Sequence, residues 1–277
     1  MKLTALIPAH NDDYTLGFCL RSIADHFDEI VVLDDCSSDH TADVALDAAA
    51  RHRHVRLIRY EGAQQLGWVR ARNRLLEATD SDHLFWLDAD DVLCEYAAHR
   101  LREIAKGPRP LVRLELCEMW GDFDHTTQRL RHYDRCHVYW NRRLLKDVAW
   151  RGGSTAKYQL DGKLKPARSG GPLLFHVKGV KPDRRLVERQ YVRKWLRAGA
   201  PGRLEDFAGL AEMDEDDIHR RAVNMLLRSR QDKLRRWVQG APERPTALRH
   251  RPQRFEIVYR DGKPVDRVDH EEDRSDV

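Results

Sequence analysis

Acidic and polar residues follow three separate short apolar runs in this sequence. The first run ends at Pro8, the second at Asp34-Asp35, and a later one at Asp88, with Asp90 and Asp91 directly beyond it. Residues i and i+2 of an extended chain point the same way, so Asp88 and Asp90 can face one ligand. Carboxylate oxygens suit Mg2+ or Mn2+, whose shell is usually completed by water and substrate phosphates. The pattern therefore predicts a divalent-metal site that handles a phosphate-bearing molecule.

An Asp-x-Asp triplet alone is common and usually indicates only a solvated turn after a strand. Its place in the chain changes that interpretation, because ligands of open parallel sheets bind outside the carboxyl ends of the strands. Five carboxylates gathered at one such edge repel one another unless a cation or hydrogen-bond donors compensate them. We therefore expect the three polar clusters to share one binding site.

The elements that must position these clusters are legible in the first hundred residues. Short β-type runs at 3–8, 30–33, 55–60 and 83–87 alternate with helical spacing at 16–27, 41–50 and 69–78. Ser37, Ser38 and Asp39 offer an N-cap for the second helix. Strands that alternate with helices predict right-handed crossovers and a parallel sheet with helices on both faces.

The pattern loosens beyond residue 106. Runs at 110–119 and 136–140 predict further strands, antiparallel in direction, and 182–239 is helical in pattern and rich in arginine. Asp261-Gly262 lies between two β-type runs and is a strong signal for a hairpin. The acidic tail after it has the composition of a disordered segment.

Composition narrows the class of protein. The chain has 277 residues, of which 34% are charged, and the 49 basic and 45 acidic side chains leave a net charge of +4. No apolar run approaches the ~18 residues of a membrane span, and the opening residues are too short for a signal-peptide core. The five cysteines are scattered and form no Cys-x-x-Cys pair. We expect a protein of the cytoplasm, without a transmembrane span.

Several other chemistries at such a sheet edge lose their support. The sequence contains no G-x-G-x-x-G after the first strand, no P-loop, no G-x-S-x-G elbow and no H-E-x-x-H helix. A haloacid-dehalogenase-type phosphatase places its Asp-x-Asp after the first strand, and a receiver domain is less than half as long as this chain.

Four ordered motifs carry a family resemblance. They are residues 6–11 (LIPAHN), 32–41 (VLDDCSSDHT), Gly67 with residues 71–73 (ARN), and 85–91 (FWLDADD). Together they resemble the family-2 glycosyltransferases of GT-A fold over residues 3–105. The resemblance implies an α/β fold with a GT-A-type, mostly parallel sheet flanked by helices. It also implies a division into a glycosyltransferase domain (1–181) and a C-terminal extension (182–277) that is helical and ends in a hairpin and the acidic tail. Within the domain, 1–105 is the nucleotide-sugar half and 106–181 the acceptor half.

The resemblance also implies roles for the polar residues around the nucleotide. Pro8, Ala9 and Asn11 would line the base pocket, and Asp35 would accept a hydrogen bond from the uracil imide. Arg72 would lie near the base or the diphosphate; a solvated helix face is the alternative for it, and a helix-capping acid for Asp35.

The metal and the diphosphate would be held by later residues. Asp88, with Ala89 beside it, would meet the ribose and the metal, and Asp90 would bind the metal that bridges the diphosphate. His176, which ends another apolar run, would close the metal shell or serve as a structural histidine. Lys178 begins a basic run that continues with Lys181, Arg184 and Arg185, and this run would clamp the diphosphate from a loop. A solvated surface is the alternative for the run.

The catalytic base is the part that the family pattern does not locate. Small bacterial members often have a His-Glu pair after a Trp-x-Gly segment, but no Glu follows Trp150-Arg151-Gly152 closely here. Asp161 is our first candidate for the base, and Asp122 and Asp124 are its rivals. A surface-loop acid is the alternative for each.

These observations predict a metal-dependent transferase, inverting by family default, that uses Mn2+ or Mg2+ and a nucleoside-diphosphate sugar such as a UDP-sugar. A glycan or lipid-linked acceptor is the commonest choice, and the arginine-rich helices leave a nucleic-acid acceptor open. A non-catalytic nucleotide-sugar-binding or interaction protein is the alternative function. The C-terminal helices also suit a homo-oligomer interface.

Overall fold

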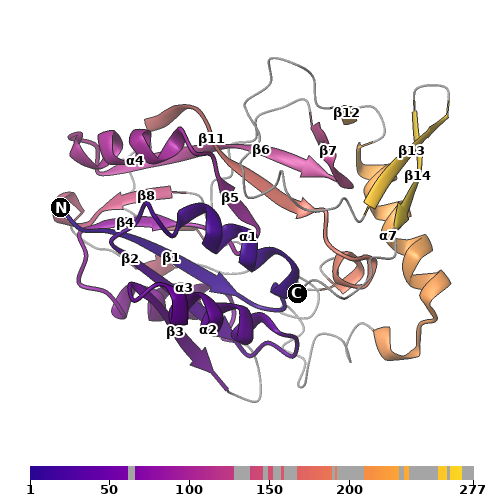
Figure 1. Ribbon diagram of the computed structural model, residues 1–277, viewed down its shortest axis with the longest axis horizontal. Coiled ribbons are helices and arrows are strands. Elements are labelled where there is room, and N and C mark those ends of the chain that lie inside the picture. The colour runs from indigo at the N-terminus through magenta and orange to yellow at the C-terminus, as the bar shows by residue number, and fades with distance from the viewer. Residues whose placement is uncertain are drawn as a thin grey trace.

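The first strand of the chain, β1 (Leu3–Ala9), lies inside a ten-stranded sheet in the computed structural model of the protein (Figure 1). The structure describes residues 1–61, 66–127, 138–145, 149–151, 157–158, 167–188, 191, 209–230, 234–236, 255–260 and 263–269. β1 pairs in parallel with β2 (Glu29–Asp35) and β4 (His83–Trp86), and β3 (Val55–Tyr60) pairs in parallel with β2. The predicted parallel sheet is therefore confirmed.

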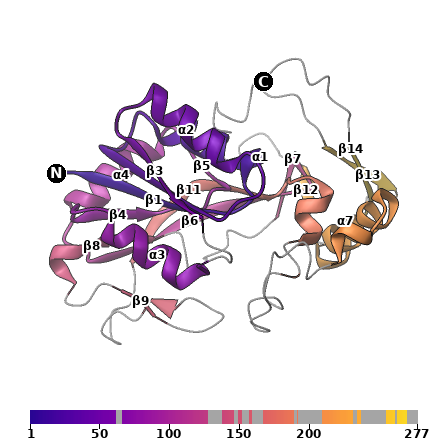
Figure 2. The same cartoon turned by 90° about the horizontal axis from the view of Figure 1, so that it is seen from below.

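Helices cover both faces of this sheet. In Figure 2, α1 (Asp13–Ile23) and α2 (Thr41–Arg51) lie above the sheet and α3 (Trp68–Glu77) lies below it. The helix α4 (Ala97–Lys106) contributes to the same apolar core as α1 and α2, whereas α3 packs in a second core across the sheet. The apolar positions on one face of each helix account for this division, because each buries a stripe against the sheet.

The second half of the domain completes the sheet with strands of mixed direction. These are β5 (Asp91–Leu93), β6 (Leu111–Trp120), β7 (Asp122–Thr127), β8 (Val138–Asn141) and β11 (Ala167–Gly179). β8 is antiparallel to both β4 and β6, so β6 runs in the same direction as β4. β11 pairs in parallel with β6 and antiparallel with β5. A single-turn helix, η1 (Arg142–Leu144), and a small ladder of β9 (Trp150–Arg151) and β10 (Lys157–Tyr158) complete this half.

A smaller unit with its own apolar core lies beyond the carboxyl ends of β6 and β11 (Figure 1). It contains η2 (Leu210–Glu212), α7 (Glu215–Arg230) and the hairpin of β13 (Phe255–Arg260) and β14 (Lys263–Asp269). The helical and hairpin appendage is thus confirmed, while the boundary at residue 181 stays a prediction. No helix among the described residues is long and apolar enough to cross a membrane.

One expectation in this unit is wrong. Residues 234–236 fall in the segment predicted as helical, but Leu234–Arg236 forms β12, which pairs antiparallel with β7. β7 borders the sheet and offers a row of backbone donors and acceptors, and such an edge takes up a further strand readily. Tertiary pairing outweighs local helical preference at this position.

Candidate active site at the carboxyl ends of the parallel strands

The polar clusters singled out in the sequence meet at one edge of the sheet. Ala9 at the end of β1 is in register with Asp34 near the end of β2, and β4 pairs with β1 on the opposite side. Asp35, Asp90 and Asp91 are all buried. The shared edge follows from the parallel direction of the three strands, as the alternation of strands and helices predicts.

Asn11 ties the loop after β1 to the loop after β2. Its backbone N–H donates to Ser37 Oγ at 3.0 Å, and its side-chain Oδ1 accepts from the Ser38 N–H at 2.9 Å. Asn11 and Cys36 both have a positive φ, 52° and 62°, a region that non-glycine residues seldom occupy. Left-handed residues at two adjacent strand ends indicate that the surrounding contacts hold these loops in one shape.

Asp35 binds the backbone that leads into the N-terminus of α3. Its carboxylate accepts hydrogen bonds from the backbone N–H groups of Leu66, at 2.7 Å, and Gly67, at 3.2 Å. Burial raises the pKa of the Asp35 carboxyl group, although these two hydrogen bonds act against it. Each carboxylate oxygen has two lone pairs, so Asp35 can accept a further hydrogen bond from a ligand. The His10 ring contacts the same residue through Nδ1, 2.8 Å from the Asp35 carbonyl oxygen.

Two neighbouring residues of α3 connect the end of β4 with β9. Arg72 is 1% exposed and donates to Asp88 Oδ1 at 3.0 Å, and its guanidinium lies 5.1 Å from the Trp150 ring centroid. Asn73 bonds both backbone groups of Trp150, donating to its carbonyl at 3.0 Å and accepting from its N–H at 2.8 Å. Arg72 is therefore buried against Asp88 and is not part of a solvated helix face. Asn73 holds β9 against α3.

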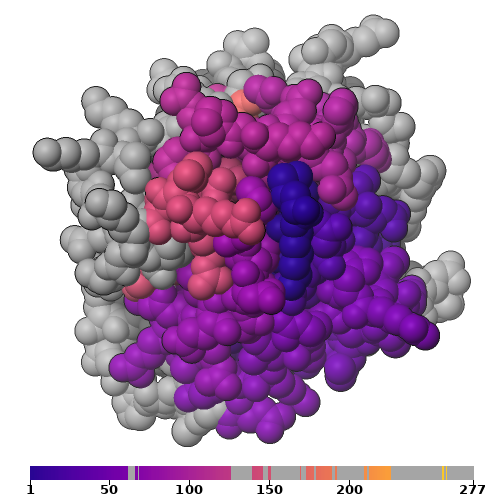
Figure 3. Space-filling model, turned by 90° about the vertical axis from the view of Figure 1, so that its left-hand side faces the viewer, coloured from indigo at the N-terminus to yellow at the C-terminus, as the bar shows by residue number. Residues whose placement is uncertain are grey.

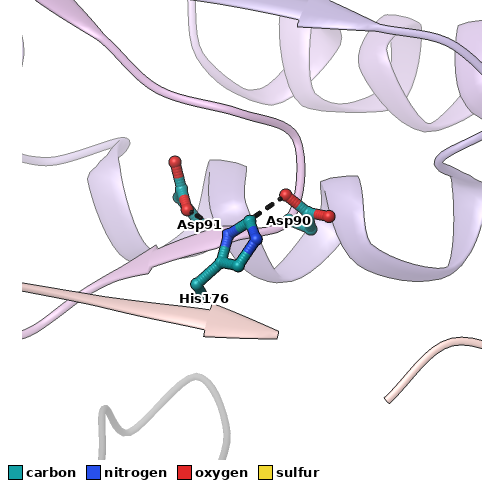
Figure 4. Close-up of side chains that lie close together, drawn as sticks. All are labelled: Asp90, Asp91 and His176. Atoms are coloured by element: carbon teal, nitrogen blue, oxygen red, sulfur yellow. Dashed lines mark hydrogen bonds and ion pairs between the residues drawn. The ribbon is translucent and has the colours of Figure 1, made fainter. Parts of the chain in front are cut away.

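Asp90, Asp91 and His176 form a compact group with the donor atoms of a metal site (Figure 4). One ligand atom from each residue lies within 4.8 Å of the others, and all three side chains are buried. His176 Nδ1 is 2.8 Å from Asp91 Oδ1 and 3.4 Å from Asp90 Oδ1. Two carboxylates and an imidazole are donors that Mn2+ accepts, so the residues present fit a divalent ion.

Asp91 has a second contact that orients this group. Its Oδ2 accepts the backbone N–H of Asp88 at 2.7 Å, while Oδ1 faces His176. A carboxylate bonded to one ring nitrogen of a histidine fixes the orientation of the ring, and here Nδ1 faces both Asp91 and Asp90. Asp88 pairs with Arg72 and is not one of the three residues of this group, so its expected role at the metal stays a prediction.

A lysine and an arginine that follow β11 lie against the same acidic edge. Lys181 pairs with Asp12 Oδ1, and its Nζ is also 3.4 Å from Asp90 Oδ2. Arg185 Nη2 is 3.3 Å from Asp39 Oδ2, and the charges of Glu188 and Asp39 raise the pKa of this arginine against the opposing effect of burial. The segment after β11 is thus held against the loops after β1 and β2.

The rival base candidates occupy the start of β7. Asp122 is buried, and both of its carboxylate oxygens contact His125 Nδ1, at 2.7 and 2.8 Å. Asp122 Oδ1 also accepts from the Asp124 backbone N–H at 2.9 Å. A general base must come within about 2.6–3.2 Å of the proton that it removes. The carboxylate of Asp122 is engaged by two residues of its own strand, His125 and Asp124. The side chain of Asp124 is the more accessible of the two.

Some of the remaining predicted site residues lie in the part of the chain that the structure describes, and others lie outside it. Pro8 and Ala9 end β1, and Ala89 is buried between the two carboxylates that flank it in sequence. Lys178 was expected in a loop, which is wrong, because it lies in the strand β11; its side chain is outside the described part. Asp161, the first base candidate, lies outside the described residues.

Comparison with known proteins decides the family. A family model described as "Glycosyl transferase family 2" matches residues 4–179. The chain belongs to glycosyl transferase family 2. The match spans the strands of the sheet from β1 to β11, and β12 lies outside it. The resemblance in the sequence is therefore confirmed and extends beyond residue 105.

Curated relatives of this family-2 chain match only part of it. The "SPbeta prophage-derived glycosyltransferase SunS" of Bacillus subtilis (strain 168) is 32% identical over 109 residues, which are 39% of this chain and 24% of that protein. The "Uncharacterized glycosyltransferase YibD" of Escherichia coli (strain K12) is 31% identical over 93 residues, or 32% and 26% of the two chains. The matches span about a quarter of the relatives' length.

A solved structure supports the fold of this family member. S. aureus TarS residues 1–349, in complex with UDP-GlcNAc, aligns with 82% of this chain and 72% of its own at a TM-score of 0.50 and 16% identity. The predicted GT-A-type arrangement is therefore confirmed at the level of the fold.

Sequence reasoning gave no role to three residues that the structure places at or near this edge. Asp91 was named only as a member of the acidic cluster, and in the structure it begins β5 in register with His176. Glu118 is buried in β6, where it is in register with His176 of the neighbouring strand β11. Asp12 follows the first polar cluster, and only the structure brings Lys181 to it. Contacts between segments far apart in the sequence, which no local pattern specifies, place all three.

Proposed function

We propose that this family-2 chain is a metal-dependent glycosyltransferase that uses a nucleoside-diphosphate sugar, specifically a UDP-sugar. The observation that carries the proposal is the buried group of Asp90, Asp91 and His176 at the same sheet edge as Asp35. A diphosphate needs a cation beside it and a nucleobase needs hydrogen-bonding groups, and this edge offers both within one family fold.

Different residues of the edge are assigned to different parts of the donor molecule. Asp35 and Asn11, with Pro8 and Ala9 at the end of β1, are assigned to the base. The buried pair of Arg72 and Asp88 is assigned to the ribose side. The low exposure of Arg72 supports a fixed orientation, because a guanidinium held by a carboxylate and an aromatic ring has little freedom.

Asp90 and His176 are assigned to hold Mn2+ or Mg2+, and Asp91 to orient His176. When bound, a divalent ion neutralises the charge that builds on the departing diphosphate. Lys178 is assigned to the diphosphate. Burial of the three side chains excludes water around the charges, which strengthens each electrostatic contact.

Transfer to the acceptor requires a base on the face of the sugar opposite the diphosphate. Inversion follows from a single displacement by the deprotonated acceptor. We assign the base to Asp161, with Asp124 and Asp122 as rivals. Asp122 is the weaker rival, since its carboxylate is buried and engaged by His125.

The acceptor is assigned to glycans or lipid-linked sugars, the commonest acceptors of such enzymes. A nucleic-acid acceptor, suggested by the arginine-rich sequence, is tested by titrating binding to duplex DNA against salt concentration. No binding at low ionic strength removes that acceptor.

The experiment for the donor reaction is turnover of UDP-glucose, UDP-galactose and UDP-N-acetylglucosamine with and without Mn2+. We expect release of UDP and free sugar from at least one donor, dependent on Mn2+ and lost in Asp90→Ala. Asp43→Asn, which changes an exposed carboxylate of α2, is the matched control and keeps wild-type turnover. Equal turnover of the Asp90 variant and the wild type contradicts the site. UDP-sugar binding without turnover, or a fixed oligomer without either, favours a binding or interaction protein.

A further inference from the structure

Lys181 lies where a cation is expected to bind. It follows β11, five residues after His176, and it is only 5% exposed. Its ammonium pairs with Asp12 and lies 3.4 Å from Asp90 Oδ2. Asp90 therefore has His176 near one carboxylate oxygen and Lys181 near the other. The charge of the lysine partly compensates the buried acids at this edge.

An ammonium differs from a metal ligand in its chemistry. It carries three hydrogen-bond donors and no lone pair, so it cannot coordinate a cation. It can only compete with a metal for the oxygens of Asp90, and it repels a divalent ion that approaches them. Removing a buried carboxylate's partner leaves an uncompensated charge, so Lys181 leaves Asp90 at low cost only if another anion receives the ammonium.

The backbone on either side of Lys181 is held firmly. A Cβ added to Gly179 would lie 2.9 Å from Trp120 Cε3, so the end of β11 packs closely against β6. After Lys181, Leu186 and Val187 are buried in the core of the smaller unit. Arg185 fixes the same segment to Asp39. The lysine side chain, with its four-carbon stem, is then the part that moves while its backbone stays in place.

We propose that Lys181 is the resident counter-cation of Asp90, and that it makes binding of the divalent ion depend on the diphosphate of the nucleotide. Without nucleotide, the ammonium opposes the metal at Asp90. The diphosphate supplies anionic oxygens that accept the ammonium, so its arrival frees Asp90 for the metal. This inference rests on the proposed function, since it concerns the same donor site. The coupling is reciprocal, so the metal strengthens nucleotide binding by the same factor.

Mn2+ titrations followed by electron paramagnetic resonance test the inference, because free Mn2+ is measured without any turnover. The full chain is titrated with Mn2+ alone and with Mn2+ plus saturating UDP. We expect K181M to bind Mn2+ without UDP at least tenfold more tightly than the wild type. Saturating UDP should strengthen Mn2+ binding in the wild type by a factor at least three times larger than in K181M.

Two variants control for charge and for docking of the segment. K181R keeps the charge and should bind Mn2+ alone within threefold of the wild type. R185M removes a charge from the same segment but not from Asp90, and its Mn2+ affinity should stay within twofold. Circular dichroism and thermal melting establish whether each variant is folded. If K181M does not fold, the Mn2+ affinity of K181R is the test of the role of the charge.

The inference is overturned if folded K181M binds Mn2+ alone no more tightly than the wild type, if R185M reproduces the effect of K181M, or if K181R binds Mn2+ tenfold more tightly than the wild type. Failure of the proposed function has a different signature. Mn2+ binding to Asp90→Asn that equals the wild type in the presence of UDP removes the metal site itself. If Asp90→Asn loses Mn2+ binding but the Mn2+ affinity of K181M equals that of the wild type, the proposed function stands. Only the role of Lys181 is then removed.

Discussion

The two ends of β2 carry buried carboxylates in very different surroundings. At its start, Glu29 accepts hydrogen bonds from Thr79 at 2.6 Å, Arg56 at 2.8 Å and Thr4 at 3.0 Å, and Lys2 lies 3.1 Å away. Burial raises the pKa of Glu29, but these four partners outweigh burial and lower it to about 2. Figure 3 views the molecule from this end, where the first residues, in indigo, reach the surface. The protein itself supplies the hydrogen-bonding and charged partners of this carboxylate.

At the other end of β2 the balance is reversed. Burial raises the pKa of Asp35, and the hydrogen bonds from Leu66 and Gly67 do not offset it. Nearby, the buried carboxylates of Asp90 and Asp91 lie beside His176, and Lys181 compensates their charge only in part. The difference shows that partners within the protein stabilise the carboxylate at one end of the strand. It supports the proposal that the other end keeps unfavourable charge for a donor molecule and its cation to relieve.

The largest effect that this comparison predicts is at Asp90. Asp90→Asn keeps the shape of the side chain but removes a charge that we assign to the metal. We expect kcat/KM for the donor to fall about 10³-fold, or about 4 kcal/mol, with a melting temperature equal to or above that of the wild type. Steady-state release of UDP and thermal melting check both halves. A lower melting temperature with normal turnover would make Asp90 structural, like Glu29.

The base is expected to give the next largest loss. Asp161→Asn should slow release of UDP about 10²-fold while UDP binding stays unchanged, because general-base catalysis contributes about 10²–10⁴ in rate. Asp124→Asn is the matched control, and calorimetry of UDP binding separates binding from chemistry. Normal turnover in the Asp161 variant together with a large loss in the Asp124 variant would transfer the role to Asp124.

At the stable end, Glu29→Gln should lower the free energy of unfolding at pH 7 by about 2 kcal/mol and leave turnover unchanged. The full pKa shift implies more, but Lys2 and Arg56 are partly exposed and solvent screens their charges. Urea unfolding measures the loss, with the exposed Glu77→Gln as control.

The same variant tests the sign of the pH dependence. Because the folded pKa of Glu29 lies below its unfolded value, its stabilisation is complete above pH ~5 and is lost as the pH falls toward about 2. The difference in unfolding free energy between wild type and Glu29→Gln should therefore be constant from pH 7 to pH 5 and shrink below pH 4. A difference that grows on acidification would refute the assigned shift.

The smallest stability effect is expected at Asp35. Asp35→Asn removes a carboxylate whose charged form burial disfavours, so the loss in unfolding free energy should stay below about 1 kcal/mol despite the weakened bonds to Leu66 and Gly67. UDP binding should weaken about tenfold, measured by calorimetry. A stability loss as large as that of Glu29→Gln, with normal UDP binding, would erase the contrast between the two ends.

The sequence predicts the structure of the first hundred residues well for a local reason. Each of the first four strands is a short apolar run, and three of them end in polar residues within one or two positions, as at Asp35 and Asp88. Parallel pairing then brings these ends to one edge without any further information. The cap of α2 also follows, with Asp39 Oδ1 accepting the Thr41 N–H at 2.9 Å, although His40 is the N-cap residue.

Contacts between distant segments escape prediction. The pairing of Asp91 with His176 joins residues 85 positions apart, and that of Asp12 with Lys181 joins residues 169 positions apart. Both depend on the register of β11 against its neighbours, which shifts at several bulges. Asn73 likewise has the pattern of a helix-face residue, and its bonds to Trp150 appear only once β9 lies against α3.

The central claim is that the acid-tipped strands deliver their oxygens to one donor site with a divalent ion. Anomalous diffraction at the manganese edge, from crystals soaked with UDP and Mn2+, tests it most directly. The account predicts one anomalous peak within coordination distance of Asp90 and His176, with the uracil beside Asp35. A peak bound elsewhere, or a nucleotide that contacts neither Asp35 nor Asp90, would contradict it.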